Sequence, residues 1–179
     1  FVEFYADHNF YAEGDEPFSL VQYMAGCQSI WGTDQPGGCL GVDVFDPTAP
    51  LPPPYGDPSM AQIPPVEQWV EYIPFATDLS YAVDYITIAK RPDTTASIDC
   101  IGDIPQASFE AIDGAEFEVA TVFLDGFEAD TACPDGNSWV LSASDPVGAI
   151  MGGADSWSSY TFPAGFRIEP LWTPPPPVD

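Results

Sequence analysis

The sequence predicts an all-β fold, an antiparallel β-sandwich or barrel held by disulfides, with long proline-rich loops and very little helix. Many short segments are rich in β-branched and aromatic residues, and glycine, proline, asparagine and aspartate recur between them as turn signals. Apolar residues rarely recur at helical spacing. At 179 residues and 45% hydrophobic, the chain can bury one sizeable core. We therefore expect one β domain over residues 1–173 and a proline-rich tail over residues 174–179.

The first third of the chain predicts strands separated by long loops. Residues 1–11 and 18–25 have strand composition, and apolar side chains on both faces of the second segment predict a central position. A glycine-rich loop over residues 26–40 and a short strand over residues 41–45 follow. Residues 46–65 hold too much proline for a regular helix or a central strand. They predict an extended segment that covers a sheet, although a long ordered loop can also be functional.

The remaining two thirds predict a series of short strands. Residues 66–72 fit either one helical turn or a strand, and residues 148–155 are rich in glycine. In the last expected strand, alternation places Phe166, Ile168 and Trp172 on the inward face. The strands are expected at residues 83–90, 97–101, 108–112, 115–123, 138–144 and 160–172.

The charge balance is extreme, because 3 basic residues stand against 28 acidic ones, for a net charge of −25. Phosphate groups are bound mainly by lysine and arginine, so nucleic acids and anionic membranes are excluded as partners. Most carboxylates have no basic residue to pair with, and their mutual repulsion at neutral pH destabilises the folded state. Protons or bound cations would relieve that repulsion.

The cysteine pattern predicts a secreted protein. The four cysteines show no C-x-x-C spacing and the chain has a single histidine, so structural zinc is disfavoured and two disulfides are expected. Of the three connectivities that four cysteines allow, we favour Cys27 with Cys39 and Cys100 with Cys133. Disulfides indicate an oxidising compartment. The absence of an initial methionine agrees with removal of a secretory signal, and no apolar run is long enough to span a membrane.

An acidic loop follows the strand expected at residues 115–123 and predicts a cation site. Calcium takes roughly six to eight oxygen ligands from carboxylates and carbonyls. The spacing of the acids does not match an EF-hand, and a solvated surface turn is the alternative. The candidate ligands are Asp125, Glu128, Asp130, Asp135 and Asn137.

Aromatic residues in loop-like or glycine-rich surroundings predict a second site. They could line a pocket for a flat apolar or aromatic molecule such as a pigment, with neighbouring Lys90 and Arg91 pairing with an anionic group of that ligand. His8, the single histidine, is where proton transfer or a transition metal would fall. Packing beneath the proline-rich cover is the alternative role of these rings. The aromatic candidates are Trp69, Tyr72, Trp157 and Tyr160.

These features favour a secreted, non-enzymatic binding protein for a small aromatic ligand, a divalent cation or both. There is no G-x-S-x-G motif, and a single histidine limits nucleophile–base pairs, so no catalytic residue is assigned. One alternative is an acidic accessory subunit of a secreted enzyme or cell-wall assembly. Another is a carboxylate-based hydrolase, with Glu116 and Glu118 two apart on one strand face, or a carbohydrate-binding module.

Overall fold

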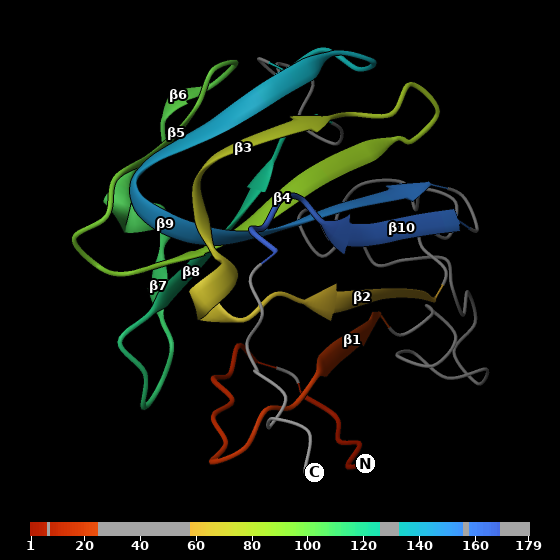
Figure 1. Cartoon of the computed structure of the whole chain (residues 1–179). Coiled ribbons are helices and arrows are strands. Elements are labelled where there is room, and N and C mark those ends of the chain that lie inside the picture. The colour runs from red at the N-terminus through yellow and green to blue at the C-terminus, as the bar shows by residue number, and fades with distance from the viewer. Residues whose placement is uncertain (7, 25–57, 126–132, 156–157, 169–179) are drawn as a thin grey trace, which may run out of the picture.

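A computed structural model of the chain describes residues 1–6, 8–24, 58–125, 133–155 and 158–168. In these ranges the chain forms antiparallel strands and two short 3₁₀ turns, with no α-helix (Figure 1). The all-β prediction is therefore confirmed, and the main sheet is curled into a half-barrel (Figure 1). No helix in the described ranges is long and apolar enough to cross a membrane.

The elements are named in chain order. They are β1 Leu20–Met24, β2 Ser59–Ile63, the 3₁₀ turn η1 Val66–Gln68, β3 Val70–Ala76, β4 Val83–Lys90, β5 Ala96–Ile98, β6 Gly102–Asp103, the 3₁₀ turn η2 Gln106–Ser108, β7 Glu110–Ala111, β8 Glu118–Phe123, β9 Ser138–Asp155 and β10 Ser158–Pro163.

Strand β9 organises the main sheet. The strand order is β6–β5–β9–β4–β8–β7, and β3 and β10 also pair with β9. The first part of this 18-residue strand pairs with β3 and β5, and the last part pairs with β4 and β10. The strand bends between these two parts, so the sheet curls around its own inner face (Figure 1). Strands β1 and β2 form a separate two-stranded sheet.

The glycine-rich residues 148–155 lie within β9, whereas the sequence predicted a strand only as far as residue 144. Aromatic rings from neighbouring elements fill the space that a side chain at these glycine positions would otherwise occupy. A Cβ atom on Gly148 would lie 2.5 Å from Trp69 Nε1, and one on Gly152 would be equally crowded by the Tyr85 ring. Glycine is therefore required here for close approach of a ring to the backbone, and it does not mark the end of the strand.

The hydrophobic core fills the inside of the curl. In β4 the buried residues alternate with partly exposed ones, as expected for a strand with one face on the core. Burying one isoleucine side chain contributes about 1.5–3 kcal/mol to folding, so this cluster carries much of the stability. Its large aliphatic members include Ile73, Ile86, Ile88, Ile98, Leu141, Val147 and Met151.

Three expectations about strands are wrong. Residues 1–6 and 8–11 contain no strand, and β1 is not central, because it pairs only with β2 among the residues described. The composition of a five-residue strand does not reveal how many neighbours it has. The last described strand ends at Pro163, and Phe166 and Ile168, expected to face inward, are exposed. Trp172, also expected to face inward, lies outside the described residues. The partner of β1 comes from residues 58–65, the described end of the proline-rich cover.

Candidate functional site

Three aspartates from different parts of the chain meet at one end of the sheet. Asp84 is the second residue of β4, Asp125 follows β8, and Asp135 lies in the turn before β9. Since β4 pairs with both β8 and β9, the sheet itself brings the three together. One carboxylate oxygen from each lies within 4.8 Å of the others. Asp84 and Asp125 are buried, and Asp135 is exposed. We call these residues the aspartate cluster.

Asp84 is held from several sides. The Tyr160 hydroxyl donates a hydrogen bond to Asp84 Oδ1, and the Asp78 amide donates to Asp84 Oδ2 at 3.2 Å. The Asp84 amide in turn donates to Asp125 Oδ1 at 2.5 Å. The Leu124 amide donates to the Asp84 carbonyl at 2.8 Å, which extends the pairing of β4 with β8 up to Asp125. These bonds fix Asp84 and Asp125 relative to each other.

Gly153 allows Tyr160 to reach Asp84. In the register of the sheet, Gly153 of β9 is the partner of both Asp84 in β4 and Tyr160 in β10. A Cβ atom on Gly153 would lie 2.6 Å from Asp84 Oδ1 and would overlap the Tyr160 ring. The Tyr160 ring therefore packs over the backbone of Gly153, where no side chain blocks its hydrogen bond to Asp84.

Gly153→Ala is expected to destabilise the protein by about 1–3 kcal/mol, because the new methyl group overpacks the contact between Tyr160 and Asp84. The measurement is the free energy of unfolding in urea. The same substitution in a Tyr160→Ala background is the control and should cost clearly less, since the ring is gone. Equal costs in the two backgrounds would show that the ring contact is not the reason for glycine at this position.

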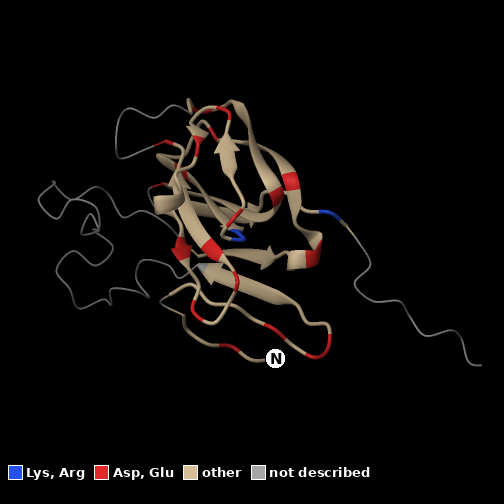
Figure 2. Cartoon of the chain, turned by 90° about the vertical axis from the view of Figure 1, so that its left-hand side faces the viewer, with Lys and Arg blue, Asp and Glu red and all other residues tan. Residues whose placement is uncertain are grey.

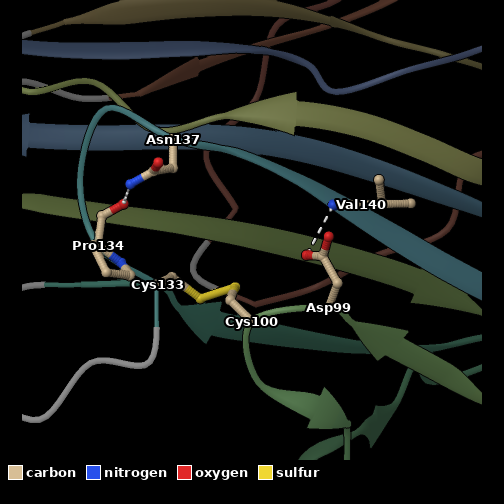
Figure 3. Close-up of a disulfide and its surroundings, with 6 residues drawn as sticks. All are labelled: Asp99, Cys100, Cys133, Pro134, Asn137 and Val140. Carbon is tan, nitrogen blue, oxygen red and sulfur yellow. Dashed lines mark hydrogen bonds between the residues drawn. A yellow bond between two sulfur atoms is a disulfide. The ribbon is translucent and has the colours of Figure 1, made fainter.

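The turn that carries Asp135 is anchored at both ends. Cys133 forms a disulfide with Cys100, as the sequence predicted (Figure 3). The Asn137 side-chain amide donates to the carbonyl of Pro134 at 3.0 Å and to that of Asp135 at 3.2 Å. Gly136 adopts a φ of 69°, the left-handed conformation that glycine tolerates best. The Asn137 amide thus stabilises its own turn. The other predicted pair, Cys27 and Cys39, lies outside the described residues.

The cluster concentrates negative charge away from basic side chains. Burial raises the pKa of Asp84, and burial together with the neighbouring Asp135 and Asp84 raises the pKa of Asp125 to about 8. Burial and the Asp84 carboxylate raise the pKa of Tyr160, so its hydroxyl remains a donor. Lys90 and Arg91 pair elsewhere, with Glu118 and Glu116. Figure 2 shows that acidic residues far outnumber basic ones on the described part of the chain.

In EDTA, the free energy of unfolding should rise as the pH falls from about 8 towards 5. The pKa of Asp125 is raised to about 8 in the folded state, so the folded state takes up a proton in this range and the unfolded state does not, and lowering the pH favours folding. Burial also raises the pKa of Asp84, which acts in the same direction. Below about pH 4 the trend should reverse, because Glu118, whose pKa is lowered in the folded state, then loses its ionic contact with Lys90.

Urea unfolding at constant ionic strength from pH 5 to pH 8 tests this pH dependence. Asp125→Asn should flatten the slope, whereas Asp145→Asn, an equal charge change at an exposed position of β9, should leave it in place. Maximal stability of the unsubstituted chain at pH 8 would contradict the expectation.

The structure brings together two of the predicted metal ligands. Asp125 and Asp135 meet, whereas Glu128 and Asp130 lie outside the described residues. The sequence reasoning missed Asp84, which is 41 residues from Asp125. The local sequence gives one indication that Asp84 belongs to a site. It is an aspartate near the start of VDYITIAK, a segment otherwise apolar enough to be a buried strand.

Lys90 lies in the core instead of a ligand pocket. Its side chain is 1% exposed and forms an ion pair with Glu118, while its Nζ lies 4.3 Å from the centre of the Phe109 ring. Gln106 Nε2 donates to Glu118 Oε1 at 2.7 Å. Burial acts to raise the pKa of Glu118, but the hydrogen bonds from Lys90 and Gln106 and the charge of Lys90 lower it more. A carboxyl with a lowered pKa is poorly suited to general-acid catalysis.

The other candidates for an aromatic pocket are dispersed. Trp69 is buried, and both its ring and Arg91 contact Phe117, at 5.2 and 5.4 Å between centres. Tyr72 is exposed on β3, and His8 is exposed in the N-terminal segment. Trp157 lies outside the residues that the structure describes.

Among the predicted aromatic residues that the structure describes, Tyr160 lines a hollow. The hollow has a volume of about 340 Å³ and lies beside the aspartate cluster, since Tyr160 and Asp78 both bond to Asp84. The Tyr160 ring packs edge-on against Tyr81 at 4.8 Å and parallel to Phe162 at 5.6 Å. The lining residues are Ala76, Thr77, Asp78, Tyr81, Tyr160 and Phe162.

Comparison with known proteins places the chain in a family. Neither a curated protein nor a solved structure is similar to this chain at a significant level. The family described as IgGFc binding protein matches residues 1–153. That description names binding and not catalysis, in agreement with the expectation of a non-enzymatic binding protein, and together with the Cys100–Cys133 disulfide it indicates an extracellular protein. Because the match spans most of its length, the chain belongs to the IgGFc binding protein family.

Proposed function

We propose that this chain is an extracellular domain that binds a protein partner, with the Fc region of IgG as the first candidate. The observation that carries the proposal is the family match over residues 1–153. The description of that family supplies the candidate partner. The small aromatic ligand expected from the sequence is an additional ligand in this proposal.

The two-stranded sheet offers a suitable contact surface. Tyr23 of β1 and Met60 of β2 are cross-strand partners, and they are 70% and 58% exposed. Val21, two residues before Tyr23, is also exposed. Tyrosine and methionine are enriched at protein interfaces and charged residues are depleted from interface centres, so this face differs from the acidic remainder of the surface. We call Val21, Tyr23 and Met60 the β1–β2 face.

The charge of the chain adds a second requirement on the partner. A net charge of −25 favours partners whose contact surface carries lysine and arginine around an apolar centre. Association should then be fast at low salt and slower at high salt, because screening weakens long-range attraction.

Surface plasmon resonance with immobilised Fc tests the proposal, and Fab from the same antibody serves as the matched control. We expect binding to Fc alone, with an association rate that falls between 50 mM and 500 mM NaCl. Tyr23→Ser should weaken binding at least tenfold, whereas Tyr72→Ser, at an exposed tyrosine on β3, should change it less than twofold. Equal binding to Fc and Fab, or none to either, would reject Fc as the partner.

The hollow beside Tyr160 favours a second ligand, a flat apolar or aromatic molecule such as a pigment or the aromatic side chain of a partner. Its volume of about 340 Å³ lies within the range typical of small-molecule sites. Native mass spectrometry and an absorption spectrum of protein from its natural source should reveal a bound molecule that Phe162→Ala reduces. A native mass equal to the mass of the chain alone would count against a small-molecule ligand.

A further inference from the structure

We propose that Asp84, Asp125 and Asp135 bind a divalent cation, and that the cation is calcium. This goes beyond the proposed function, since a binding domain needs no metal ion to contact a protein partner. The three carboxylates converge from β4, from the segment after β8 and from the turn before β9. One oxygen from each lies within 4.8 Å of the others, which is the spacing that a shared ion requires.

A buried oxygen within the cluster provides independent support. Asp125 is 6% exposed, and its Oδ2 has no hydrogen-bond partner among the described residues, although its Oδ1 accepts from the Asp84 amide. Leaving a buried carboxylate oxygen unpaired costs about 1–3 kcal/mol or more, so native proteins rarely tolerate it. An ion shared by the three carboxylates would supply the missing partner.

The charges around the cluster point to the same conclusion. The chain has only three basic residues. Lys90 contacts Glu118, Arg91 contacts Glu116, and the Arg167 amide and guanidinium contact the carbonyls of Gln68 and Glu67. The positive charge that would offset three converging carboxylates must therefore come from protons or from a metal ion. A divalent ion is the stronger partner at neutral pH, because it contacts all three carboxylates at once.

The cluster is also held in place before any ion arrives. Backbone hydrogen bonds fix Asp84 to Asp125, and the Cys100–Cys133 disulfide lies two residues before Asp135. Such rigidity lowers the entropy that binding would otherwise cost. Carboxylate ligands suit hard cations, and calcium accepts the irregular geometry of ligands from separate segments more readily than magnesium does. Extracellular calcium sites commonly bind with dissociation constants of about 10⁻⁴–10⁻³ M.

Isothermal titration of the EDTA-treated full chain with CaCl₂ tests the proposal, with NaCl added to keep ionic strength constant. The constant ionic strength matters, because any salt screens a net charge of −25. We expect one calcium site per chain, with magnesium bound at least tenfold more weakly. Asp135→Asn should weaken calcium binding at least tenfold, and because Asp135 is exposed this variant should fold. Asp145→Asn is the matched control, since it removes the same charge from an exposed position outside the cluster.

Calcium binding with the same affinity in Asp135→Asn and in the unsubstituted chain would overturn the proposal, as would no binding at millimolar calcium. A thermal melt provides a second readout. Calcium should raise the melting temperature of Asp145→Asn but not that of Asp125→Asn, which keeps the shape of the buried side chain. Repeating the Fc measurement with Asp135→Asn separates the two proposals. Loss of calcium binding with unchanged Fc binding would show that the calcium site and the Fc contact are independent.

Discussion

Lys90→Met is expected to destabilise the protein by about 3–5 kcal/mol, because it leaves the Glu118 carboxylate buried without its ionic partner. Lys90 and Glu118 are both buried, and the main neutral group that then remains on the carboxylate is the Gln106 side-chain amide. Methionine keeps most of the volume of lysine, so the loss should come from the uncompensated charge and not from a cavity. The measurement is the free energy of unfolding in urea at pH 7.

The neighbouring residue provides a matched control for this prediction. Arg91 forms an exposed pair with Glu116, with Nε and Oε1 3.5 Å apart, so Arg91→Met should cost about 1 kcal/mol or less. Lys90→Met/Glu118→Gln should recover most of the loss, since glutamine carries no charge and can still bond to Gln106. A cost for Arg91→Met as large as that for Lys90→Met, or a double variant no more stable than Lys90→Met, would refute the argument.

The Lys90–Glu118 ion pair shows that two adjacent basic residues can have different structural roles. The sequence presents Lys90 and Arg91 as adjacent cations at the end of a strand, equally suited to an anionic ligand. Alternation along β4 places Lys90 on the same face as Ile86 and Ile88, and therefore in the core, whereas Arg91 follows the strand and remains accessible. The facing residue Glu118 is the register partner of Lys90 on β8. Strand register, which depends on contacts between distant segments, decides the role of each residue.

The fold could be predicted where local patterns dominate. Strand β4 begins and ends where the alternating apolar residues indicated, because β-branched residues favour strands. Strand β9 could not be predicted in full, since glycine and Pro146 normally interrupt strands. Here the rings of Trp69, Tyr85 and Tyr160 occupy the space above the glycines, and that packing becomes visible only once the neighbouring strands are known.

The candidate site divides in the same way. Asp125 and Asp135 lie close together along the chain, in a stretch dense with acids and turn residues, so local reasoning was sufficient to select them. Asp84 joins them only through the pairing of β4 with β8 and β9. Asp84 is buried in the folded chain, and a buried aspartate needs partners, which here are Tyr160 and the two other aspartates of the cluster.

Removing the Cys100–Cys133 disulfide should have the other large effect, a loss of roughly 3–4 kcal/mol in the chain-entropy account of disulfides. The two cysteines are 33 residues apart, so the bond restricts a long loop in the unfolded chain. Urea unfolding of Cys100→Ala/Cys133→Ala measures the loss, and alanine at both positions avoids a free thiol that could mispair with Cys27 or Cys39.

The same variant should weaken calcium binding, because the bond anchors the turn that carries Asp135 while Asp84 and Asp125 are fixed by backbone hydrogen bonds. Stability and calcium affinity should therefore both fall, whereas Lys90→Met should lower stability and leave the calcium affinity of the folded protein within about twofold. A reductant serves as the control, since it should destabilise the unsubstituted chain more than the double alanine variant. Calcium affinity that survives loss of the disulfide would show that the turn is held by Asn137 and Gly136 alone.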